Sequence, residues 1–148
     1  MSAPAESVSA GARAAALLEE ACRSGCASSL RLEVVRDLAL DISRQLGALA
    51  GLAEDNAAPD ILAEAALRCA DLATLAACNV AELPAGEAAR AIEAARLAAG
   101  TVRDLSSVVE ACGGQQDGEH ASNLLRDVQS AAWRAEFAAR LVGGEPSS

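Results

Sequence analysis

Aromatic side chains are almost missing from this chain of 148 residues: Trp133 and Phe137 are the only two, and tyrosine is absent. Lysine is absent as well, so all 12 basic side chains are arginines, against 21 carboxylates, and the net charge is −9. Nucleic acids and anionic membrane surfaces attract proteins that present a basic face. We therefore expect this acidic chain to bind neither nucleic acid nor membrane.

Histidine is nearly absent too, and His120 is the only one. Catalytic triads and zinc sites need histidine in the company of other groups, so we expect His120 to be a solvated residue at a helix start. Glu33, Asp37 and Asp41 form an acidic ridge, but the Glu-x-x-His pairs of a di-iron bundle are missing, and the ridge is expected to face solvent. Phosphate-binding loops and nucleophile elbows are missing as well. The sequence thus predicts no catalytic residue and no cofactor.

Long apolar runs are also missing. No stretch of about twenty uncharged apolar residues occurs, and the first residues lack the basic segment of a secretion signal. We therefore expect a cytoplasmic protein, whose thiols would be reduced.

Alanine, leucine, glutamate and arginine dominate what is present, and all four are strong helix formers. Glycine, proline and polar clusters divide the chain into five helical segments, expected at about 9–28, 29–54, 59–83, 86–112 and 120–142. Short connections favour antiparallel neighbours. The sequence therefore predicts an all-α, antiparallel up-down bundle of four core helices plus a C-terminal fifth helix. We expect this bundle to form one domain over 9–142, with flexible tails at 1–8 and 143–148.

Apolar residues recur at steps of three and four, the period of one buried helix face. In the second segment we expect a single buried stripe, made of Val34, Val35, Leu38, Ile42, Leu46, Leu49 and Leu52. Gly100 lies inside the fourth segment at a cost of about 1 kcal/mol against alanine, so it is expected to mark the close approach of another helix. Many other core positions are alanine, which buries little apolar area. A homodimer would add what one copy lacks.

The five cysteines allow more than one interpretation. Cys22 and Cys26 are four residues apart and share a helix face, a spacing that suits a soft ion such as Cu(I) or a thiol redox pair. Cys69 belongs to an apolar stripe, whereas Cys78 and Cys112 lie near helix C-termini, where the helix dipole disfavours a thiolate. One interpretation is that all five fill small core sites and bind no metal; the other is a site at Cys22 and Cys26.

The third and fourth segments resemble the helices of bacterial copper-storage proteins, which are cysteine-rich four-helix bundles. In that family inward cysteines follow an Ala-Asp pair at steps of three and four, and a proline precedes the next helix. Here Ala70-Asp71 and Pro84 are in place, but alanine or valine stands at the matching ligand positions: Ala73, Ala76, Val80, Ala88, Ala91, Ala95, Ala98 and Val102. The resemblance implies a shared scaffold and argues against copper storage.

The last segment carries both aromatic residues on one line. Trp133, Phe137 and Leu141 follow one another at steps of four. A second line runs along an adjoining face: Leu125, Val128, Ala132, Ala135, Ala139 and Val142. Either both lines pack on the bundle, or the Trp133 line docks a protein partner or a second subunit, since aromatic anchors are enriched at interfaces.

We therefore predict a non-enzymatic helical bundle that acts through protein contacts, as an adaptor, a regulator or a dimeric scaffold. Trp133, Phe137 and Leu141 are its predicted contact residues. One alternative is the soft-metal or thiol site described above. Another is a small-molecule or enzymatic bundle that uses carboxylates and arginines, in which case Arg36, Arg68 or Arg103 would hold an anionic ligand.

Overall fold

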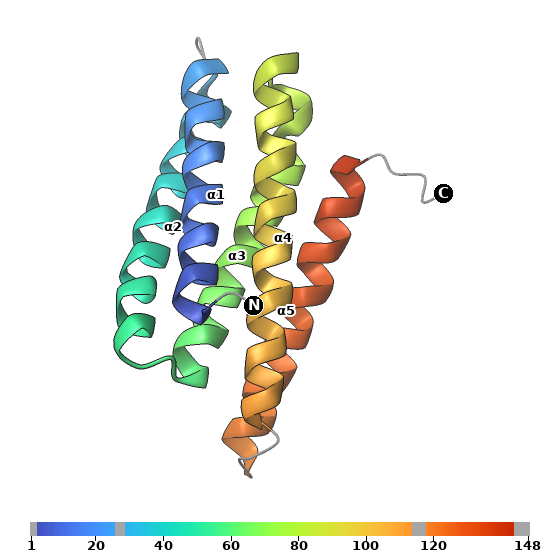
Figure 1. Ribbon diagram of the computed structural model, residues 1–148. Coiled ribbons are helices and arrows are strands. Elements are labelled where there is room, and N and C mark those ends of the chain that lie inside the picture. Colours follow the sequence, from blue (N-terminus) through green and yellow to red (C-terminus); the bar gives the residue numbers. More distant parts are fainter. Residues whose placement is uncertain (1–2, 26–28, 114–117, 144–148) are drawn as a thin grey trace.

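A computed structural model describes residues 3–25, 29–113 and 118–143, and over these residues the chain forms five α-helices and no strand. The helices are α1 (Pro4–Gly25), α2 (Leu30–Asp55), α3 (Pro59–Asn79), α4 (Ala85–Gly113) and α5 (Glu119–Gly143). Each helix runs antiparallel to the one before it (Figure 1). The first four close a ring in which α1 packs on α2 and α4, and α3 packs on the same two helices. The predicted bundle of four core helices is confirmed.

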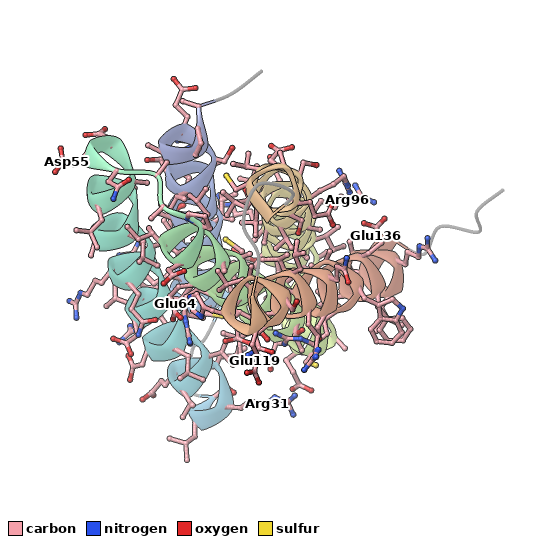
Figure 2. The ribbon with its side chains drawn as sticks, turned by 90° about the horizontal axis from the view of Figure 1, so that it is seen from below. Arg31, Asp55, Glu64, Arg96, Glu119 and Glu136 are labelled. Carbon is pink, nitrogen blue, oxygen red and sulfur yellow. The ribbon has the colours of Figure 1, made fainter. Side chains whose placement is uncertain are left out.

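The fifth helix lies outside this ring, in the groove between α3 and α4. Seen along the bundle, it crosses the other helices obliquely (Figure 2). Its C-terminal end leans away from α4 (Figure 1). One long side of α5 is therefore turned away from the core.

Local chemistry explains where several helices begin and end. The Ser29 hydroxyl accepts a hydrogen bond of 3.2 Å from the Leu32 N–H and caps α2. Pro59 occupies the first turn of α3, where its missing N–H costs nothing. At its other end α3 tightens into a 3-10 turn at Val80–Glu82 before Pro84. The α-helix therefore ends earlier than the expected position near 83.

The first helix begins at Pro4, whereas the sequence favoured a start at Ser9 after a loose tail. Val8, which the prediction placed in that tail, is fully buried in the core. Tertiary packing stabilises this first turn as a helix, although the helix propensity of its residues does not predict it. Residues 144–148 of the expected C-terminal tail lie outside the described residues.

Gly11 on α1 lies against side chains of the other three core helices. A Cβ atom placed on it would be 2.6 Å from Sγ of Cys69 on α3, 3.4 Å from Cδ1 of Leu46 on α2 and 3.5 Å from Cγ2 of Thr101 on α4. A side chain at this position would force the Cys69 side chain to shift. The expectation for Gly100 is wrong, because a Cβ there would meet no atom within 4 Å.

The apolar stripe of α2 is divided between core and solvent. Val35 and Leu46 are buried, but Val34, Leu38 and Leu52 are about half exposed. The expectation of a single buried face is therefore wrong in part. The apolar stripe is wider than the part of α2 that packs on α1 and α3. The fifth helix covers α3 and α4, but within the described residues no such additional helix covers the outer side of α2.

Candidate docking face on the fifth helix

The inner face of α5 is built into the core. Val128, Ala131 and Ala135 are fully buried. The hydroxyl of Ser106 on α4 donates a hydrogen bond of 3.2 Å to the carbonyl of Val128. The rest of the second line (Leu125, Ala132, Ala139 and Val142) is partly buried against the same cluster. This line is the one that packs on the bundle.

Two ion pairs flank the inner face on opposite sides. Nη1 of Arg134 lies 3.2 Å from Oδ1 of Asp71 on α3. Oε1 of Glu136 lies 3.2 Å from Nη2 of Arg103 on α4, and Figure 2 shows Glu136 on the side of α5 that faces α4. Partly exposed pairs of this kind contribute about 0.2–1 kcal/mol each. Their main effect is to limit rotation of α5 about its own axis.

A third contact joins the starts of α5 and α3. Nε2 of His120 lies 3.0 Å from Oδ1 of Asp60, and both side chains are exposed. The expected solvent exposure of His120 is therefore confirmed, and the residue also links two helix ends. With the two flanking pairs, α5 is held to the bundle near its start and along both sides.

The outward face of α5 carries Trp133, Phe137 and Leu141, which we call the α5 outer line. Their side chains are 69, 54 and 62 % exposed. The two aromatic rings stack on each other, with centroids 5.7 Å apart and planes 5° from parallel. Of the two lines predicted for this helix, the one that contains Val128 and Ala135 lies in the core, and the α5 outer line faces solvent.

Two arginines share the outward face with the α5 outer line. Arg126 and Arg140 lie seven residues before and after Trp133, a step of nearly two full turns that keeps all three on one side of the helix. Both are exposed, and within the described part of the chain no carboxylate lies within 4.0 Å of either. In a protein of net charge −9, an arginine therefore lies toward each end of the α5 outer line, while the exposed carboxylates Glu119 and Asp127 lie closer to the start of the helix.

A second exposed apolar face lies on α2, and sequence reasoning had assigned much of it to the core. Leu30, Val34 and Leu38, which we call the α2 outer line, are 75, 50 and 47 % exposed. Their spacing of four residues is the same signal that identified the α5 outer line, but it was merged with the neighbouring buried stripe. The acidic ridge of Glu33, Asp37 and Asp41 runs beside this line and faces solvent as expected.

The cysteines behave differently from one another. Cys69 is fully buried, and desolvation raises the pKa of its thiol from 9.0 to about 12, so it stays protonated. Cys78 is exposed, and Cys112 is partly buried. Cys22 is buried, and Cys26 lies outside the described residues. The soft-metal or thiol site at these last two positions stays a prediction, and no group of three or more metal-binding side chains occurs in the described part of the chain.

The arginines considered for an anionic ligand all face carboxylates. Nε of Arg68 lies 2.8 Å from Oε2 of Glu64, and its Nη1 lies 3.4 Å from Oδ2 of Asp71. Arg103 pairs with Glu136, as described above, and Arg36 lies 3.8 Å from its neighbour Asp37. Their positive charge is thus already compensated within the protein.

An open hollow of about 420 Å³ lies beside the start of α1. It is lined by three carboxylates, one arginine and small residues: Glu6, Glu54, Asp104, Arg13, Ala5, Ser7, Ser9 and Ala10. The excess of negative charge disfavours an anionic ligand here. None of Arg36, Arg68 and Arg103 lines this hollow, and the small-molecule alternative stays a prediction.

No known protein family, curated protein or solved structure matches this chain. The resemblance to copper-storage bundles therefore stays a prediction. Among the described helices, none has the length and apolar character needed to span a membrane.

Proposed function

We propose that this protein acts by binding a protein partner through the outward face of α5. The observation that carries the proposal is the position of the only two aromatic side chains, which stack on each other in solvent beside Leu141. Single exposed apolar residues are common and need no explanation. A continuous line of three, holding the largest side chains of an alanine-rich chain, is typical of an interface.

The way α5 is held supports this proposal. Binding is weakened by the entropy lost when mobile groups become ordered, and a rigid surface loses less. The buried inner face and the ion pairs of Arg134 and Glu136 give α5 one orientation. The α5 outer line is thereby presented as a preformed helical ridge, which fits an apolar groove or another helix.

The class of function that follows is an adaptor, a regulator or a dimeric scaffold, none of which needs a catalytic group. The proposal keeps the cytoplasmic location expected from the sequence. The proposed partner surface is apolar at its centre and acidic at its rim, because Arg126 and Arg140 lie around Trp133 on the protein's own side.

The test compares the full chain with a Trp133→Ala/Phe137→Ala variant. Leu40→Ala is the matched control, because Leu40 is also exposed but lies off both outer lines. A partner recovered with the parent chain and purified should bind the control equally well and the double variant at least tenfold more weakly. As the only tryptophan, Trp133 also reports contact directly through its fluorescence. Equal binding by all three chains would refute the proposal.

A further inference from the structure

We infer that the partner of the α5 outer line is the α2 outer line of a second copy of this chain. The inference rests on the proposed function, because it uses the same face of α5, and it names the surface that this face binds. Both lines are apolar and exposed, and each lies on the outward side of a long helix. Together they form two halves of one contact between copies.

The two lines match in length and spacing. Trp133, Phe137 and Leu141 are four residues apart, and so are Leu30, Val34 and Leu38. At a rise of 1.5 Å per residue, each line extends over about 12 Å. Two helices that cross at a small angle can therefore bury both lines along their whole length.

The charges beside the two lines are opposite. Arg126 and Arg140 lie beside the α5 outer line, whereas the α2 outer line runs beside the acidic ridge of Glu33, Asp37 and Asp41. Arg31, seven residues before Leu38, lies on the same side of α2, but its Nε donates a hydrogen bond of 2.7 Å to Oδ1 of Asn79 on α3. A contact between arginine and carboxylate combines charge with hydrogen bonds. Contact between two α5 faces would bring arginines together, and contact between two α2 faces would bring carboxylates together. Such like-charge contacts are unfavourable.

The charges also select the relative direction of the two helices. In an antiparallel arrangement Trp133 lies against Leu38 and Leu141 against Leu30. At that register Arg140 is level with residue 31, two residues from Glu33, and Arg126 is level with residue 45, about one turn beyond Asp41. In a parallel arrangement Arg126 would extend beyond the start of α2 at Leu30. The antiparallel arrangement therefore keeps both arginines within about one helical turn of the acidic ridge.

A contact between α5 and α2 joins two different surfaces. Such contacts build rings or open chains of copies, or a dimer in which both contacts form reciprocally. A net charge of −9 on each copy opposes association. The contact therefore depends on local pairing of opposite charges. Charge reversal on either face should therefore weaken it strongly.

The first experiment measures self-association of the full chain by sedimentation velocity over a concentration series. One variant disables α5 (Trp133→Ala/Phe137→Ala), and another disables α2 (Leu30→Ala/Val34→Ala/Leu38→Ala). Each alone should associate at least tenfold more weakly than the parent chain. Because each retains the face that the other lacks, an equal mixture of the two should form a 1:1 complex.

The second experiment reverses charges. Arg126→Glu/Arg140→Glu should weaken association at least tenfold, and mixing it with a Glu33→Arg/Asp41→Arg chain should restore a 1:1 complex. Arg96→Glu is the matched control for a change of net charge, because Arg96 is exposed on α4 and points away from the bundle (Figure 2). Far-UV circular dichroism checks that every variant is folded. The charge variants are a separate test should the alanine variants fail to fold.

The outcomes separate this inference from the proposed function. Loss of association in the α5 variant with none in the α2 variant would overturn the inference but support binding through α5. The inference would also be overturned if the parent chain stayed monomeric at a concentration on the order of 200 μM, where even a weak contact would form. The partner test described above would then still decide the proposed function. Formation of the mixed 1:1 complex in both experiments is the expected result.

Discussion

The centre of α1 and the outward face of α5 use side-chain size in opposite ways. At Gly11 the smallest residue lies against side chains of three other helices. On α5 the two largest residues, Trp133 and Phe137, lie in solvent. The comparison shows that the core combines small residues with buried leucine and valine and leaves both aromatic side chains outside.

The largest change in stability is expected at Gly11, where the surroundings are crowded. Gly11→Ala places a methyl group 2.6 Å from Sγ of Cys69. Overpacking of this kind costs about 1–3 kcal/mol, partly offset by the higher helix propensity of alanine. Chemical denaturation should show a net loss of stability. In the Gly11→Ala/Cys69→Ala variant the sulfur is gone, so the two substitutions should destabilise less together than the sum of each alone.

The neighbouring Cys69 should make stability depend on pH in alkaline solution. Burial raises the pKa of the Cys69 thiol to about 12, and unfolding returns it toward 9.0. Above pH 9 the unfolded chain therefore binds fewer protons than the folded chain, and stability falls as pH rises. We expect a loss of roughly 1 kcal/mol per pH unit between pH 9 and 11 from this thiol. The slope should be shallower by that amount in Cys69→Ala, and equal slopes would contradict the assignment.

Gly100 sharpens the comparison because it is a helical glycine without crowded surroundings. No atom lies within 4 Å of the Cβ that Gly100→Ala would add. The substitution should raise the unfolding free energy by about 0.5–1 kcal/mol, since alanine favours the helix and restricts the unfolded chain. Gly47→Ala on α2 is a matched control with equally open surroundings and should change stability in the same direction. Destabilisation in both would contradict the open surroundings of these two glycines.

The smallest effect on stability is expected on α5. Trp133→Ala removes an exposed ring and its stacking with Phe137, but it gains helix propensity. The unfolding free energy should change by no more than about 0.5 kcal/mol. Thermal unfolding of the chain at low concentration, where association does not contribute, is the suitable measurement. A loss above about 2 kcal/mol would instead place Trp133 among the groups that hold the fold.

Local signals predicted the helices well. Ser29 caps α2 and Pro59 opens α3 as their residue types indicate. These features depend on a few neighbouring residues, so the sequence is enough to place them. The start of α1 was missed because Val8 is held by residues far away in the chain.

The candidate faces were predicted less evenly. The α5 outer line was identified by the spacing of its two aromatic residues, but the sequence left open whether it packs or faces solvent. The α2 outer line was missed because Val34 and Leu38 follow the same period as their buried neighbour Val35. Periodicity shows that a helix has an apolar side, but it does not show how much of that side another helix covers.

The sequence by itself determined the all-α class, the number and order of the helices, and the residue types that begin them, because capping, helix propensity and periodicity act within a few turns. Tertiary structure alone decided that Gly11 has crowded surroundings and Gly100 open ones. It also decided that one line of α5 is buried while the other faces solvent. The physical reason is that burial depends on which helices surround a face, and those helices come from distant parts of the chain.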